Sequence, residues 1–181
     1  WVSSEGFDIP VAVRDTPEAA AEVAQERALG WLVWDLHFGV EPGIADYFDM
    51  VDSQQLDRIR SLSASDGLVA GLDIYPVSVN AIGGERPNWS PRQLIQLAEK
   101  EIERWHDRYY QPFWIAETSN LTLPIYQQIP WLEEFSSALG RLRFNGRPAR
   151  GMCWYSRGDQ YDWQTALIEP SGSVTEVGLF D

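Results

Sequence analysis

The hydrophobic pattern of this chain of 181 residues alternates between two kinds of segment. Runs rich in β-branched and aromatic residues, which are typical of buried strands, lie near residues 68–77, 112–118 and 149–156. Before and between these runs, apolar residues recur every three or four positions, as on one face of a helix. Because nearly continuous apolar strands alternate with helices, the pattern predicts an α/β fold in which helices cover a parallel sheet.

Capping residues indicate where the expected helices begin and end. Thr16 and Pro17 form a helix start, with an N-cap residue followed by proline at the first helical position, and Gly39 is suited to end that helix. Ser90 and Gln93 form a capping box in front of the next long helix. The expected helices span about residues 17–38, 53–62, 91–108 and 130–143.

The remaining segments are expected to be largely irregular. Residues 1–15 contain one short apolar piece, Ile9–Val13, and residues 80–89 are expected to form a loop. The turn-rich tail, residues 167–181, has room for a short hairpin. The helical face that carries Glu99, Glu101 and Glu103 is expected to be solvated.

Aromatic residues make up 13% of the chain and include nine Trp, a high number for this length. One interpretation is a large aromatic core, where Trp31 and Trp34 are expected because they lie at helical spacing. The other interpretation is sugar binding, because the flat C–H faces of pyranose rings stack on aromatic rings.

Charge and cysteine content narrow the classes of partner. The net charge of −13 argues against nucleic acid and anionic membranes, which bind basic surfaces. No apolar run reaches the roughly 18 residues that a membrane span needs, and no signal-peptide pattern opens the sequence. Cys153 is the only cysteine, which excludes an internal disulfide and suits a reducing compartment. A cytoplasmic location is therefore expected, with secretion as the alternative, and no motif predicts a metal or cofactor.

Polar and aromatic side chains gather where the three predicted strands end. Since ligands bind at the carboxyl ends of parallel strands, these side chains are candidates for a site. Glu117 stands out, because it directly follows a buried run; it is either a solvated or ion-paired strand-end charge or a catalytic carboxylate. The candidates are Asp73, Tyr75, Ser78 and Asn80 after the first strand, Glu117 to Asn120 after the second, and Trp154 to Arg157, Asp159, Gln160, Asp162 and Trp163 after the third.

Three of these segments together resemble a known enzyme clan, the retaining glycoside hydrolases built on (β/α)8 barrels. "GLDIYP", "PFWIAETSN" and "GMCWYSRGDQYDW" are similar to the sixth, seventh and eighth strands of family 1 β-glucosidases and their glycosidase-like relatives. Their order and approximate spacing agree as well. The chain departs from the family where "DIYP" stands for the usual "NYY" and "ETSN" for "ENG".

The resemblance implies a role for each matching residue. Glu117 would be the nucleophile of a retaining, double-displacement hydrolysis of a β-linked glycoside, and Tyr75 would donate a hydrogen bond to it. Trp154 would be the platform on which the sugar stacks. Further sugar contacts would come from Asn120, Asp159, Gln160 and Trp163.

The resemblance also implies that part of the barrel lies outside this chain. The clan carries its acid/base glutamate as Asn-Glu at the end of strand four, and no Asn-Glu pair occurs in this sequence. Residues 1–181 are therefore expected to be one partial domain, the C-terminal portion (about strands 5/6 to 8) of a (β/α)8 TIM barrel. The expected partners are a carbohydrate substrate and the N-terminal half of the barrel, as another segment or chain.

Two alternatives stay open. The absent acid/base group is also consistent with a catalytically inactive carbohydrate-binding barrel. An unrelated parallel α/β enzyme could use the same strand ends for other chemistry.

Overall fold

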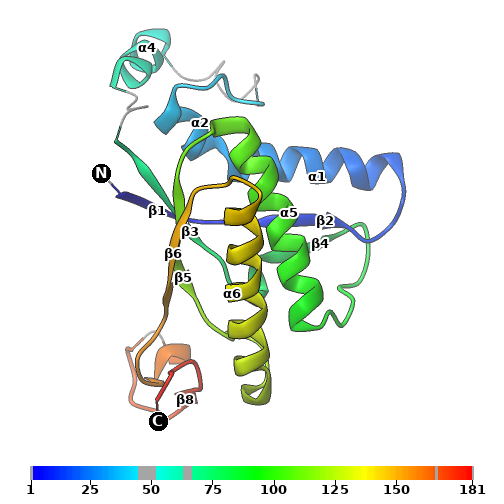
Figure 1. The fold of residues 1–181 in the computed structure, drawn as a ribbon, viewed down its shortest axis with the longest axis vertical. Helices are drawn as coiled ribbons and strands as arrows, with labels where there is room; N and C mark the ends of the chain where they lie inside the picture. Colours follow the sequence, from blue (N-terminus) through cyan, green and yellow to red (C-terminus); the bar gives the residue numbers. More distant parts are fainter. Residues whose placement is uncertain (1, 45–51, 63–66, 166, 181) are drawn as a thin grey trace.

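Four parallel strands form the main sheet, in the order β1-β3-β5-β6 (Figure 1). The computed structural model describes residues 2–44, 52–62, 67–165 and 167–180. Three of the strands confirm the predicted ones with tighter bounds, and the parallel α/β architecture is as expected. The bounds are β1 Val2–Gly6, β3 Val69–Asp73, β5 Phe113–Thr118 and β6 Ala149–Trp154.

The strand β1 corrects the expectation that residues 1–15 are irregular around a short apolar piece. Its sequence, VSSEG, lacks the apolar run of a central strand. Among the described residues it pairs only with β3, from Val2 opposite Val69 to Gly6 opposite Asp73. A strand with a single described neighbour needs fewer apolar residues, so pattern alone did not identify it.

A second, two-stranded parallel sheet follows the ends of β1 and β3. It joins β2 (Ile9–Ala12) to β4 (Val79–Ile82), so the predicted loop over residues 80–89 is wrong in its first three residues. A 3₁₀ turn, η1 (Pro76–Ser78), connects β3 to β4. Figure 1 shows this small sheet beneath α1.

The helices largely follow the predicted bounds, with one break. The expected helix over 17–38 is two helices that meet at Trp31, just after Gly30, whose low helix propensity favours an interruption there. Gly39 ends the second of them with a left-handed conformation, φ 64°, as expected. The described helices are α1 Pro17–Gly30, α2 Leu32–Phe38, α4 Ser53–Leu62, α5 Pro91–Tyr109 and α6 Gln128–Phe144.

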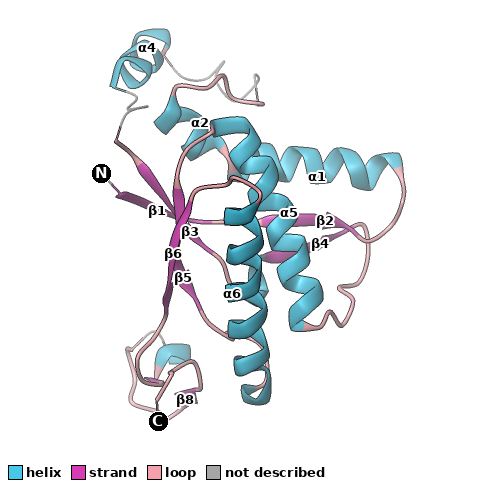
Figure 2. Cartoon of the chain, in the orientation of Figure 1, coloured by secondary structure: helices cyan, strands magenta, loops and turns pink. Residues whose placement is uncertain are grey.

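Helices α5 and α6 lie side by side along the main sheet (Figure 2). The capping box of Ser90 and Gln93 is present at the start of α5. None of the described helices is long and apolar enough to cross a membrane.

The aromatic core is built mainly from the helices. Trp34 and Trp105 are fully buried, and their rings meet edge to face with centroids 5.6 Å apart. Trp31 is buried beside Tyr109, and Trp131 beside Phe135. The predicted core positions of Trp31 and Trp34 are confirmed, so much of the high Trp content serves packing.

Glu101 contradicts the prediction of a solvated face on α5. Its side chain is 0% exposed, and both of its oxygens bind Arg27 of α1. Arg104 adds a third hydrogen bond, at 2.8 Å. The spacing of charges on α5 could not show that α1 lies across this face and brings a guanidinium to it.

The tail also differs from expectation. Its strand β8 (Val174–Thr175) does not form a hairpin within the tail, but pairs antiparallel with β7 (Gln160–Tyr161). A short turn, η3 (Trp163–Thr165), lies between them. The tail therefore packs below the carboxyl ends of β5 and β6 (Figure 1).

Candidate active site

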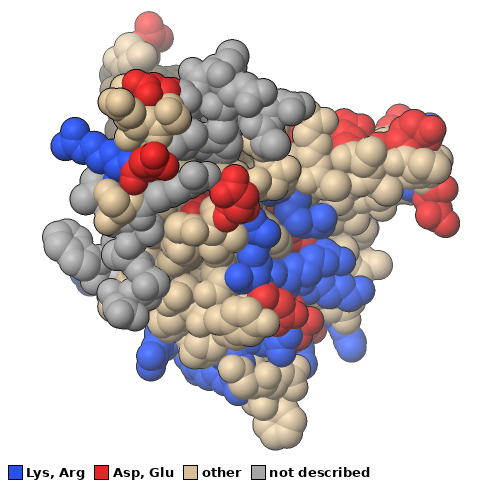
Figure 3. Space-filling view, turned by 90° about the horizontal axis from the view of Figure 1, so that it is seen from above, with Lys and Arg blue, Asp and Glu red and all other residues tan. Residues whose placement is uncertain are grey.

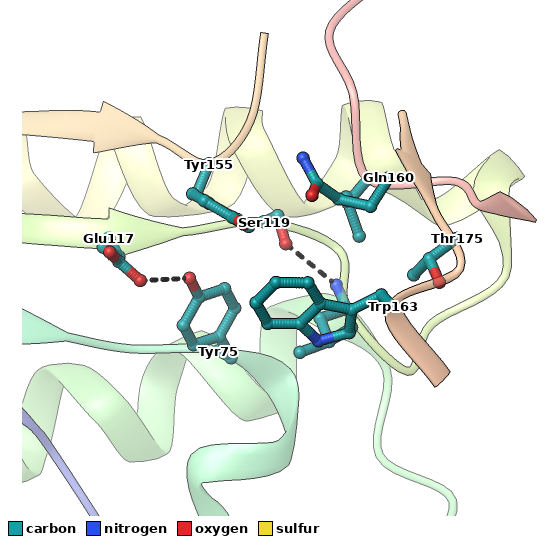
Figure 4. Close-up of a pocket in the computed structure, with 9 residues that line it drawn as sticks. Tyr75, Glu117, Ser119, Tyr155, Gln160, Trp163 and Thr175 are labelled. Carbon is teal, nitrogen blue, oxygen red and sulfur yellow. Dashed lines mark hydrogen bonds between the residues drawn. The ribbon is translucent and has the colours of Figure 1, made fainter. Parts of the chain in front are cut away.

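A cavity of about 310 Å³ lies at the carboxyl ends of β3, β5 and β6. This is the edge of the sheet at which the sequence predicts a site. Most of its lining is aromatic or apolar, and a few polar groups point into it (Figure 4). The residues around it are Tyr75, Glu117, Ser119, Leu121, Tyr155, Gln160, Trp163, Thr175 and Val177.

Glu117 and Tyr75 are joined by a hydrogen bond, as predicted from the resemblance. The Tyr75 hydroxyl donates to Oε2 of Glu117 at 2.7 Å (Figure 4). Glu117 is held by β5, and the backbone of Tyr75 is fixed where its N–H donates to the Ser78 hydroxyl at 3.0 Å. Burial, and then the hydrogen bond to Glu117, raise the pKa of Tyr75, so this phenol stays protonated and remains a donor at neutral pH.

Asp73 places a second carboxyl group beside Glu117. The two residues are register partners on β3 and β5. Ser4 of β1 donates a hydrogen bond to Asp73 at 2.8 Å. Burial raises the pKa of the Asp73 carboxyl, the Ser4 hydrogen bond opposes this rise, and the neighbouring Glu117 carboxylate adds to it. The strand-end position of Asp73 was visible in the sequence, but its pairing with Glu117 was not.

Trp154, the expected platform, does not line this cavity. It is the register partner of Thr118, whose hydroxyl accepts a hydrogen bond from the indole of the buried Trp131 at 3.0 Å. Trp154 therefore lies on the helix side of the sheet, where its own indole N–H donates to the Val177 carbonyl at 2.9 Å. Because successive strand residues point to opposite faces, the next residue, Tyr155, lines the cavity instead.

The other predicted sugar contacts divide into two pairs. Gln160 and Trp163 line the cavity, and the Gln160 amide donates to the Ser156 hydroxyl at 2.8 Å. Asn120 and Asp159 do not line it. Both of these bind the tail.

The contacts of Asn120 and Asp159 explain how the tail is held. Asn120 is buried and donates to the Glu176 carbonyl at 3.0 Å. Asp159 accepts from the Gly178 N–H at 2.8 Å. A Cβ on residue 178 would lie 2.5 Å from the Asp159 nitrogen, so only glycine allows this close approach. These contacts place Thr175 and Val177 against the cavity.

Asp162 also holds the tail, through hydrogen bonds to residues 171–173. One of its oxygens, Oδ1, accepts from the Ser171 N–H and hydroxyl at 2.8 Å each. It also accepts from the Gly172 N–H at 2.6 Å and the Ser173 N–H at 3.2 Å. These hydrogen bonds lower the pKa of the Asp162 carboxyl, the largest effect coming from Ser171.

Changing Asp162 to Asn is expected to loosen the tail while the fold remains. Asn tolerates the positive φ of 57° at this position, so the change removes mainly the charge that the three N–H groups face. Amide hydrogen exchange of residues 171–173 should become at least about tenfold faster at pH 7. Because the folded pKa is lowered, the wild-type protection should be complete above the ordinary value of 3.8 and decline as the pH falls below it. Unchanged exchange would contradict this role.

The described residues contain no group of three or more His, Cys, Asp or Glu placed to hold a metal ion. A carboxylate held by a phenol, beside two further aromatic rings, suits a polar ligand with apolar faces.

Comparisons with known proteins show similarity in structure but not in sequence. No family model matches the chain, and no curated protein matches its sequence. A Thermotoga maritima family 1 glycoside hydrolase, solved with a cyclophellitol analogue, matches 99% of this chain and 45% of its own, with a TM-score of 0.71 and 14% identity. A β-glucosidase from Exiguobacterium marinum matches 90% and 43%, with a TM-score of 0.69 and 14% identity.

These similarities show the fold. The chain spans less than half the length of the solved structures that it matches. Its parallel strands and helices thus correspond to part of a (β/α)8 barrel. The expected resemblance to family 1 glycosidases is confirmed at this level.

Proposed function

We propose that this chain provides part of the active site of a retaining glycosidase, in which Glu117 is the nucleophile. The observation that carries the proposal is the 2.7 Å hydrogen bond from Tyr75 to Glu117 at the edge of an aromatic cavity. A carboxylate at the end of a buried strand has little freedom to move, which suits attack on one carbon atom. The named structural neighbours support a β-linked glycoside as the substrate.

The reaction has two displacements. In the first, an oxygen of Glu117 bonds to the anomeric carbon, the bond from that carbon to the glycosidic oxygen breaks, and an acid gives its proton to the leaving oxygen. In the second, water gives a proton to the same group and displaces Glu117. Tyr155 and Trp163 would hold the sugar ring, with Gln160 as a hydroxyl contact.

The acid/base group is proposed to come from the N-terminal half of the barrel. Retention needs two carboxyl groups about 5 to 5.5 Å apart. Glu117 is the only carboxylate among the described residues that line the cavity. The strand-four glutamate implied by the family resemblance would complete the pair.

Replacing Tyr75 by Phe is expected to lower kcat about 10- to 100-fold. The change removes one hydrogen bond to a charged group, worth about 1.5–3 kcal/mol, and leaves the ring in place. The measurement is steady-state hydrolysis of a nitrophenyl β-glycoside by the intact protein. Tyr126→Phe is the matched control, because Tyr126 is exposed and lies outside the cavity. Equal rates for both variants would contradict the role of Tyr75.

The N-terminal half of the barrel is also expected to be required for the stability of residues 1–181. Within the described sheet, β1 and β6 each have one unpaired edge, and unpaired edges promote aggregation. Residues 1–181 produced alone should therefore aggregate, whereas the same residues produced with the N-terminal half should elute as a complex of defined size. A soluble monomer of residues 1–181 with a cooperative thermal transition would contradict this expectation.

A second candidate is a barrel that binds carbohydrate without cleaving it. The presence of a single carboxylate in the described cavity lining favours it. The two candidates separate by covalent trapping with a 2-deoxy-2-fluoro-β-glycoside that carries a dinitrophenyl leaving group. A glycosidase should gain one sugar mass on the peptide that contains Glu117, and Glu117→Gln should gain none. A binding protein should show no adduct, while its tryptophan fluorescence still responds to the glycoside.

A further inference from the structure

A second cavity, of about 380 Å³, lies between α1, β2 and α5. It shares no lining residue with the cavity at Glu117. Part of its wall is apolar and includes Val11, Val23 and Leu97. The charged groups that line it are Arg27, Lys100, Arg104 and Glu101.

These charges leave a positive excess in a strongly acidic chain. Three cations face one carboxylate in this cavity, although the whole chain has a net charge of −13. Lys100 is exposed and makes no hydrogen bond or ion pair within the part of the chain that the structure describes. Figure 3 shows several blue side chains close together on the face seen from above, with some red ones among them. The acidic surface thus has a local basic region.

The buried Glu101 holds two of these cations, Arg27 and Arg104, in place. Its two oxygens bind Nε and Nη2 of Arg27, which leaves Nη1 of that guanidinium without a partner among the contacts described. The Arg27 side chain is 21% exposed and therefore partly fixed by its surroundings. Arg104, bound to Glu101 through Nη1 only, is 57% exposed and keeps its other donors. Two guanidinium groups are thus oriented around one anchor before any ligand arrives.

We propose that this cavity binds a small phosphate monoester with a compact apolar body. A phosphate monoester carries about −1.5 to −2 charges at pH 7, which matches the excess of two cations. Guanidinium groups bind phosphate oxygens through paired hydrogen bonds. The apolar body would rest on Val11, Val23 and Leu97.

An added peptide strand fits this cavity less well. The Val13 N–H donates to the Ile82 carbonyl at 3.0 Å, on the β4 side of β2. Because N–H directions alternate along a strand, the N–H of residue 10 would point to the opposite, free edge of β2. That residue is Pro10, which has no N–H and therefore weakens strand addition there.

The test is a titration of the isotope-labelled intact protein with phenyl phosphate, followed by two-dimensional NMR. Amide shifts are expected at residues 9, 11, 12 and 97–104. The variant Lys100→Gln/Arg104→Gln should bind about tenfold more weakly, because it removes the two exposed cations and leaves the Arg27–Glu101 pair intact. The matched control, Arg58→Gln/Arg92→Gln, removes the same charge from exposed residues outside the cavity and should bind like the wild type.

Two further ligands measure how much the phosphate group and the apolar ring each contribute to the affinity of the cavity. Benzyl alcohol lacks the phosphate, and inorganic phosphate lacks the ring. Each should bind several-fold more weakly than phenyl phosphate. Salt at about 0.3 M should weaken the binding of phenyl phosphate, because it screens the charges. The proposal is overturned if phenyl phosphate causes no shifts in these segments, or if the two double variants bind it equally. It is also overturned if either partial ligand binds as tightly as phenyl phosphate.

Discussion

Replacing Glu117 by Gln is expected to reduce glycosidase turnover of the intact protein by about 10⁴-fold or more. Gln keeps the size of the side chain and can still accept the hydrogen bond from Tyr75, but it cannot form the glycosyl-enzyme bond. The loss should therefore appear in kcat, while binding of a non-hydrolysed sugar changes little. Hydrolysis of a nitrophenyl β-glycoside at several substrate concentrations measures kcat, and competition by the non-hydrolysed sugar in the same assay measures its binding.

A rescue experiment separates a nucleophile from a residue that only supports the cavity. In Glu117→Gly, azide can occupy the space of the lost carboxylate and attack the anomeric carbon from the same side. The product should be an α-glycosyl azide, formed by one displacement with inversion. Glu85→Gly is the matched control, because Glu85 is exposed and lies outside the cavity; this variant should give no glycosyl azide. Wild-type turnover by Glu117→Gln would exclude the proposed role.

Replacing Glu101 by Gln is expected to lower the free energy of unfolding by about 3 kcal/mol. The carboxylate is fully buried and accepts hydrogen bonds from Arg27 and Arg104. Without it, the poorly exposed guanidinium of Arg27 loses its counter-charge, and breaking one side of a buried pair typically costs about 3–5 kcal/mol. We take the lower end, because Arg27 retains some contact with solvent. Urea denaturation of the intact protein measures the change.

The exposed member of the same network provides the control. Arg104 is 57% exposed, so Arg104→Gln should cost less than about 1 kcal/mol. If the two substitutions cost the same, burial of Glu101 is not what stabilises the contact between α1 and α5. Added salt should change the effect of Arg104→Gln more than that of Glu101→Gln.

The sequence predicted those parts of the fold in which one residue pattern decides the outcome. The runs that became β3, β5 and β6 are buried and nearly continuous in apolar residues, and Ser90 caps α5 as expected. The strands β1 and β4 were missed because they depend on a partner distant in the sequence. The burial of Glu101 was missed for the same reason, since Arg27 approaches from another helix.

In the candidate site, the sequence identified the strand ends but not the direction of each side chain. Glu117, Tyr75, Gln160 and Trp163 line the cavity as expected. Trp154 does not, because the pairing of β5 with β6 is irregular, and its register decides which of Trp154 and Tyr155 faces the cavity. A shift of one residue moves a side chain to the other face of a sheet, and no local pattern fixes that shift.

The two parallel sheets impose a constraint on the length of the segment that carries Tyr75. Residues of β1 pair with residues 67 positions later, Val2 with Val69, whereas residues of β2 pair with residues 70 positions later, Ile9 with Val79. The path from β3 to β4 is thus three residues longer than the path from β1 to β2, and its surplus forms the turn after Tyr75. Deleting one residue from this segment would force the chain to give up its pairing in one of the two sheets. Homologous chains with the same pair of sheets should therefore keep the length of this segment.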